Sequence, residues 1–176
     1  MLDSQVMDVS ASGGWLTRRS LNVLGFLICA SGLGYAYYAQ FVQGFEPCPL
    51  CIFQRLALAA VGLVFLAAAV HHPRDWGAKV YGVLIDLVAT VGAVIAARHI
   101  WLQHLPPEEA PRCGPGLDYM LQTFPLGETL REVLTGSGEC ATVNWSLLGL
   151  GIPTWNLLLF LGLGTIGLLG NWRLRR

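Results

Sequence analysis

A pair of cysteines separated by two residues, Cys48 and Cys51, opens a strongly apolar stretch of the sequence. Two cysteines at this spacing can close a small disulfide, and a helix that begins at the second favours a thiolate there through its free backbone amides. Arg55 follows Cys51 by about one helical turn, where its positive charge favours a thiolate or an anionic reduced electron acceptor. The alternative for Arg55 is an interfacial side chain that extends to lipid headgroups. The cysteine pair is therefore a candidate redox centre.

Cys-x-x-Cys pairs also bind zinc or attach haem covalently, and the sequence argues against both uses. Zinc requires two further thiolate or imidazole ligands at comparable spacing, and Cys113 and Cys140 lie too far apart in the sequence to form a second such pair. Haem attachment requires a histidine directly after the second cysteine, where this chain has Ile52. We therefore interpret the pair as a redox site and expect no metal.

An oxidant must accept the two electrons that are released when such a pair forms a disulfide. No Gly-x-Gly-x-x-Gly motif follows a predicted strand, so we expect no flavin or nucleotide. A lipid-soluble quinone requires only an apolar slot between helices and one or two polar groups. His99, near the end of a later apolar stretch, is a candidate for such a group because it can donate a hydrogen bond or a proton to a quinone oxygen. The alternative for His99 is an interface anchor beside Trp101.

The elements that must position these residues are predicted to be helices that cross a membrane. The chain is 54% hydrophobic and only 12% charged, whereas soluble domains carry about 25% charged residues. A helix needs roughly 20 apolar residues to cross a bilayer, and the runs of suitable length are 21–42, 51–70, 80–101 and 145–169. A polar tail, 1–20, precedes these runs and a basic tail, 171–176, follows them. The formal net charge of zero gives no support for nucleic-acid binding.

The first of these runs has an alternative interpretation as a cleaved secretory signal. The run is longer than the apolar region of about 7 to 15 residues that such signals carry, so we favour a membrane span. Within the spans, Asp86 would be costly if it were charged, and we expect it to face the other helices as a packing or hydrogen-bonding residue. Cys29 is expected to be a small buried hydrophobe.

The distribution of basic residues predicts the orientation of the chain. Seven basic residues lie in the two tails and around the turn 71–77, whereas the opposite side carries two basic residues and seven acidic ones. The excess of basic residues marks the cytoplasmic side, so both termini are predicted to be cytoplasmic. Cys48, Cys51, Cys113 and Cys140 then lie on the other side, in a compartment where disulfides persist.

The segment 103–144 is predicted to be a long loop that carries short amphipathic helices. Apolar residues recur at helical spacing in two stripes: Leu117, Met120, Leu121 and Phe124, and then Leu126, Leu130, Val133 and Leu134. Such helices can lie on the membrane surface, or they can form a small core within the loop, and the pattern fits both. Cys113 and Cys140 flank the stripes, each beside glycines, which suggests a segment that can move.

Together these features resemble the DsbB family of disulfide bond formation proteins. The resemblance rests on four spans with both ends inside, on the motif Pro-Cys-x-x-Cys-Ile-x-x-Arg at 47–55, on His99 at the end of the third span, and on Gly-Glu-Cys-Ala at 138–141 with Pro153-x-Trp155. It extends from about Trp15 to the end of the fourth span. It implies an all-α membrane protein of the bacterial inner membrane, a four-transmembrane-helix bundle whose long loop is periplasmic.

The resemblance further implies an enzyme that reoxidises a periplasmic dithiol oxidase of the thioredoxin fold, similar to DsbA, and transfers the electrons to ubiquinone or menaquinone in the bilayer. By motif position, the partner's thiolate attacks a disulfide between Cys113 and Cys140. Cys48 and Cys51 form the disulfide beside the quinone, with Cys51 against the ring and Cys48 exchanging with Cys113.

The same resemblance places Arg55 and His99 at positions associated with quinone binding. The competing hypothesis is a structural protein with four spans, whose loops are held together by ordinary disulfides. That hypothesis accounts for Cys113 and Cys140, but it does not explain a Cys-x-x-Cys pair beside an arginine at the membrane edge.

Overall fold

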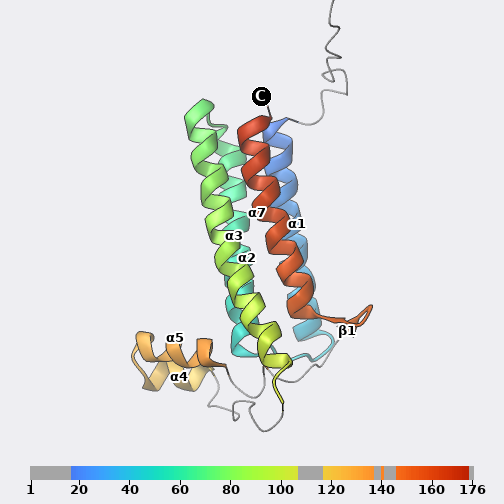
Figure 1. The fold of residues 1–176 in the computed structure, drawn as a ribbon, viewed down its shortest axis with the longest axis vertical. Coiled ribbons are helices and arrows are strands. Elements are labelled where there is room, and N and C mark those ends of the chain that lie inside the picture. The colour runs from blue at the N-terminus through green and yellow to red at the C-terminus, as the bar shows by residue number, and fades with distance from the viewer. Residues whose placement is uncertain (1–16, 107–116, 137–139, 141–145, 175–176) are drawn as a thin grey trace, which may run out of the picture.

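Four long helices form a bundle in the computed structural model, which describes residues 17–106, 117–136, 140 and 146–174. They are α1 (Arg18–Phe41), α2 (Pro49–His71), α3 (Asp75–Gln103) and α7 (Ile152–Arg173). Each is long and apolar enough to cross a membrane, and Figure 1 shows them side by side along one axis. The prediction of an all-α membrane protein with four spans is confirmed.

Two helix boundaries differ from the apolar runs of the sequence. We expected a polar turn over 71–77, but α3 already begins at Asp75. We expected the fourth span from residue 145, but α7 begins at Ile152 because the residues before it form a hairpin of β1 (Ser146–Leu147) and β2 (Leu150–Gly151). Pro153 then lies in the first turn of α7, where the missing N–H costs no hydrogen bond.

Glycines let neighbouring helices approach closely in the centre of the bundle. At Gly92 of α3 there is no room for a Cβ atom, because the ring of Phe160 on α7 occupies that position. Phe160 is only 1% exposed and packs in a core with Phe65 and Ile85. Cys29 belongs to the same core, so its predicted role as a small buried hydrophobe is confirmed. Asp86 faces α7, since its Oδ1 lies 3.0 Å from where a Cβ of Gly164 would be.

Replacing Gly92 with alanine is expected to lower the free energy of unfolding by about 1 to 3 kcal/mol, the usual cost of overpacking a core. Gly162 on α7 provides a matched control, because a Cβ there would meet no atom within 4 Å. Denaturant unfolding in detergent, followed by helical circular dichroism, measures both variants. Equal stability of Gly92→Ala and Gly162→Ala would show that α3 and α7 do not pack as described.

Two short helices lie at the end of the bundle that is opposite the start of α1 and the end of α7. Helices α4 (Leu117–Thr123) and α5 (Leu126–Thr135) lie across the bundle axis there (Figure 1). Met120 of α4 and Val133 of α5 are each 2% exposed and pack with Leu50 of α2 and Leu102 of α3. The predicted amphipathic helices are therefore present, and one part of their apolar stripes forms a small core.

The remaining apolar residues of the stripes stay exposed, among them Leu121, Leu126 and Leu130. Contact of this face with the membrane surface stays a prediction. Arg98, near the end of α3, holds the end of α5, since its guanidinium donates hydrogen bonds to the carbonyls of Leu134 (3.1 Å) and Thr135 (3.0 Å). The loop helices are thus attached to the same helix that carries His99.

Candidate functional site

The cysteine pair forms the beginning of α2. Cys48 is the residue before the helix and Pro49 begins it, so Cys51 lies in the first turn, where backbone N–H groups have no helical partner. These amides and the helix dipole favour a negative charge on sulfur. The two sulfurs are 3.3 Å apart, well beyond the roughly 2.05 Å of a disulfide bond. The structure therefore describes the pair as two thiols.

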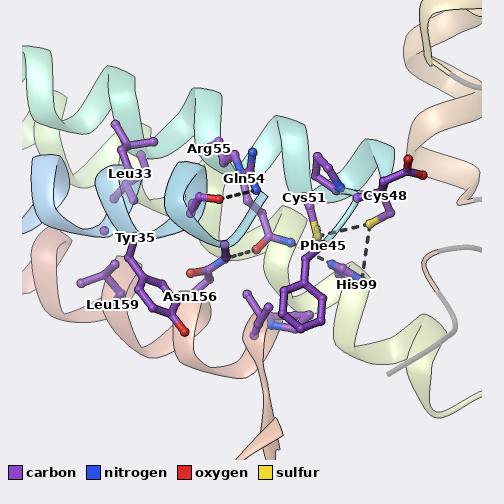
Figure 2. Close-up of a pocket in the computed structure, with 18 of the residues that line it drawn as sticks. Leu33, Tyr35, Phe45, Cys48, Cys51, Gln54, Arg55, His99, Asn156 and Leu159 are labelled. Atoms are coloured by element: carbon purple, nitrogen blue, oxygen red, sulfur yellow. Dashed lines mark hydrogen bonds between the residues drawn. The ribbon is translucent and has the colours of Figure 1, made fainter. Parts of the chain in front are cut away.

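His99 contacts this pair from α3. Its Nε2 lies 3.8 Å from Sγ of Cys48, and the ring is only 3% exposed. On its other side, Nδ1 lies 3.1 Å from Nε2 of Gln54 on α2. Asn156 of α7 completes the chain by donating from Nδ2 to Oε1 of Gln54 at 2.6 Å (Figure 2). Polar side chains from three helices thus lead to one sulfur.

Arg55 is held by α1. Its guanidinium donates hydrogen bonds to the side chain of Gln40 and to the carbonyl of Ala36, the latter at 3.1 Å, and lies 5.4 Å from the ring centre of Tyr37. These protein partners argue against a side chain that only reaches for lipid headgroups. They hold the positive charge of Arg55 one helical turn after Cys51, where Arg55 lines a cavity.

A cavity of about 490 Å³ extends from the cysteines between the helices. Its polar lining includes Cys48, Cys51, Gln54, Arg55, His99 and Asn156, and its apolar lining includes Leu33, Leu58, Leu159 and Phe160. Figure 2 shows the sulfurs at one end of the cavity and Leu33 and Leu159 towards the other. A volume of this size, with apolar walls and a few polar groups, suits a small organic ligand.

Among the loop cysteines, the structure describes Cys140 and not Cys113, which lies outside the described residues. Cys140 is fully buried and belongs to the same core as Cys48, and the His99 ring interacts with its backbone. We expected Cys48 to exchange with Cys113. That prediction is not tested, because Cys113 lies outside the described residues; the structure places Cys140 in the core that contains Cys48.

The two sulfurs and a ring nitrogen of His99 lie within 4.8 Å of one another, so a soft metal ion would find three suitable donors here. The spacing of the cysteines alone did not reveal this, since His99 is far from them in the sequence. A structural zinc site has four protein ligands, whereas the described residues supply three within that distance.

Gln54 and Asn156 were not among the residues singled out from the sequence. Each is a polar side chain within an otherwise apolar run, which is a costly place unless the group has a partner. That cost is the signal that could have identified them. Their partnership could not have been inferred, because they lie on different helices.

The family model described as "Disulfide bond formation protein DsbB" matches residues 18–170. The chain is 56% identical over 158 residues to the Disulfide bond formation protein B of Methylococcus capsulatus, a match that covers 90% of this chain and 96% of that protein. It is 53% identical to the protein of the same name from Nitrosococcus oceani, over 92% of this chain and 94% of that one. The Disulfide bond formation protein B of Hahella chejuensis is 51% identical to this chain, over 84% of this chain and 90% of that protein.

Proposed function

Because this chain belongs to the DsbB family of disulfide bond formation proteins, it is a disulfide-forming membrane oxidoreductase, and we propose that it reoxidises a DsbA-like periplasmic dithiol oxidase and transfers the electrons to a membrane quinone. The observation that carries the proposal is the cavity that has Cys48 and Cys51 at one end and apolar walls beyond them. Thiols at the mouth of an apolar cavity between membrane helices are suited to an acceptor that dissolves in lipid.

The residues around the cavity fit a quinone, either ubiquinone or menaquinone. The apolar walls suit the ring and the start of its tail, while Arg55 offers N–H donors near the sulfurs and His99 lines the same end of the cavity. A bound quinone supplies a two-electron acceptor. Oxidation of Cys48 and Cys51 to a disulfide releases two electrons and two protons, which together convert quinone to hydroquinone. Cys51, at the helix N-terminus, supplies the thiolate that faces the ring.

Electrons reach this pair from the partner by thiol-disulfide exchange. The partner's thiolate attacks the disulfide of Cys113 and Cys140 and forms a mixed disulfide, and each later transfer needs a thiolate aligned with a sulfur. The burial of Cys140 in one core with Cys48 supports a route in which Cys140, rather than Cys113, exchanges directly with Cys48. Cys113 is then the cysteine that is joined to the partner.

We further propose that the protein lies in the bacterial inner membrane with both termini in the cytoplasm. The start of α1 and the end of α7 lie at the same end of the bundle, and α4, α5 and β1 lie at the other (Figure 1). Basic residues concentrate at the first of these ends, namely Arg18, Arg19, Arg74, Lys79 and Arg173. This distribution favours a cytoplasmic location for that end and a periplasmic one for the cysteines.

The direct test mixes the purified protein with a reduced thioredoxin-fold oxidase and ubiquinone and follows the quinone absorbance. We expect catalytic loss of oxidised quinone, with one quinone reduced for every two partner thiols lost. A parallel reaction without the protein gives the background rate. A structural four-span protein would leave both partner thiols and quinone at that background, and its disulfides would stay oxidised in cells that lack quinone.

A further inference from the structure

We propose that Gln54 and Asn156 are positioning residues that fix His99 in one tautomer, with its N–H directed at the sulfur of Cys48. The inference rests on the proposed function, since it concerns the same cysteine pair. It adds a role for the buried amide of Gln54 and the partly buried amide of Asn156, which touch neither sulfur in the hydrogen bonds described, and it states which nitrogen of His99 carries the proton.

The direction of the hydrogen bonds sets the tautomer. Asn156 donates from Nδ2 to Oε1 of Gln54, so the Gln54 amide turns its NH₂ group towards His99. An amide NH₂ can only donate, and Nδ1 of His99 must therefore accept. A neutral imidazole with an acceptor at Nδ1 carries its proton on Nε2. Nε2 is the nitrogen that lies 3.8 Å from Sγ of Cys48.

This arrangement makes His99 a donor to Cys48 and not a base. A thiolate on Cys48 must exist before that sulfur can attack another, and a hydrogen bond from Nε2–H stabilises the thiolate. If both amides were reversed, Oε1 of Gln54 would face Nδ1, the ring proton would lie there, and Nε2 would accept the proton of Cys48 instead. The orientation of the Gln54 and Asn156 amides thus decides whether His99 donates a hydrogen bond to Cys48 or accepts its proton.

Burial stabilises the hydrogen bonds that join His99, Gln54 and Asn156. Gln54 is 2% exposed and His99 is 3% exposed, so no bulk water competes for these groups. The three side chains come from α2, α3 and α7, which keeps each amide from turning independently (Figure 2). Interhelical hydrogen bonds of this kind also hold helices together, and a test must therefore separate positioning from simple stabilisation.

The first test reads the tautomer directly from ¹⁵N chemical shifts of protein labelled at histidine. The chain has four histidines, and the His99 signals are those missing from His99→Ala. We expect an unprotonated Nδ1 and a protonated Nε2 in the reduced protein at neutral pH. In Gln54→Glu the side chain can no longer donate to Nδ1, so a proton should appear on that nitrogen. A proton on Nδ1 of the unaltered protein would overturn the proposal.

The second test measures the reactivity of Cys48 as a function of pH, using iodoacetamide in a Cys51→Ser background. Asn156→Leu removes the group that orients Gln54, and we expect Cys48 alkylation at neutral pH to slow about tenfold, the effect of losing a hydrogen bond to a charged group. Among the described residues, the other charged or titratable groups near this sulfur are Glu46, Arg55 and Cys140, and the variant leaves them in place.

Asn22→Leu is the matched control for stability. Asn22 and Asn171 exchange two buried interhelical hydrogen bonds, at 3.1 and 3.0 Å, between α1 and α7 far from the cysteines. This variant also loses interhelical hydrogen bonds but should keep the unaltered pH profile of Cys48. An Asn156→Leu profile identical to that of Asn22→Leu would leave the amides only a structural role and refute the proposal. Neither test contains quinone, so failure of quinone turnover alone would overturn the proposed function and not the tautomer.

Discussion

Quinone reduction should fall by roughly 10³-fold or more when Cys51 is replaced with serine, because enzymes that lose their nucleophile lose turnover on this scale. Cys51 lies in the first turn of α2 and lines the cavity beside Arg55. A serine hydroxyl at the same place does not ionise at neutral pH, so neither an attack on the acceptor nor a Cys48–Cys51 disulfide is possible. Purified Cys51→Ser, mixed with a reduced partner and ubiquinone, should leave the quinone absorbance unchanged.

The same variant should still form a mixed disulfide with the partner, because Cys113 and Cys140 are intact. Non-reducing electrophoresis after acid quenching detects that product. Cys29→Ser is the matched control, since Cys29 is a buried cysteine of the bundle core on α1 and should retain full turnover. Quinone turnover in Cys51→Ser at the rate of Cys29→Ser would remove Cys51 from the proposed mechanism.

The membrane fold could be predicted from the sequence because its signal is local. Each apolar run is close to the length of a bilayer crossing, and the helices follow the runs to within a few residues at most ends. The start of α7 was missed because the preceding hairpin is itself apolar. Its turn uses Leu148 and Gly149 at positive φ (55° and 77°), the backbone that a tight two-residue hairpin turn requires. A leucine gives no sequence signal for that conformation.

The candidate site could be predicted only where its residues are close in the sequence or typical of its chemistry. Cys48, Cys51 and Arg55 lie within about two turns of one helix, so their proximity follows from spacing alone. The contact between Gln54 and Asn156 depends on how α2 and α7 are rotated about their axes, and the apolar runs do not encode that rotation clearly. The burial of Cys140 in one core with Cys48 and Met120 likewise joins residues that are far apart in the sequence.

Replacing Cys140 with serine should stop the oxidation of a protein dithiol while sparing the chemistry at the cavity. In the proposed route Cys140 is the sulfur that exchanges with Cys48, and its burial in the same core supports that order. The variant should retain Cys113, whose thiolate can attack the disulfide of the oxidised partner and be trapped as a mixed disulfide. Steady-state partner oxidation should fall by roughly 10³-fold or more, like other losses of an exchanging nucleophile.

A small dithiol such as dithiothreitol separates the two halves of the reaction in this variant. It is small enough to reduce the Cys48–Cys51 disulfide directly, so quinone reduction with dithiothreitol should continue in Cys140→Ser and be absent in Cys51→Ser. This contrast assigns Cys140 to transfer from the partner and Cys51 to transfer into the cavity. If Cys140→Ser oxidised the protein partner at an undiminished rate, Cys113 would have to reach Cys48 itself.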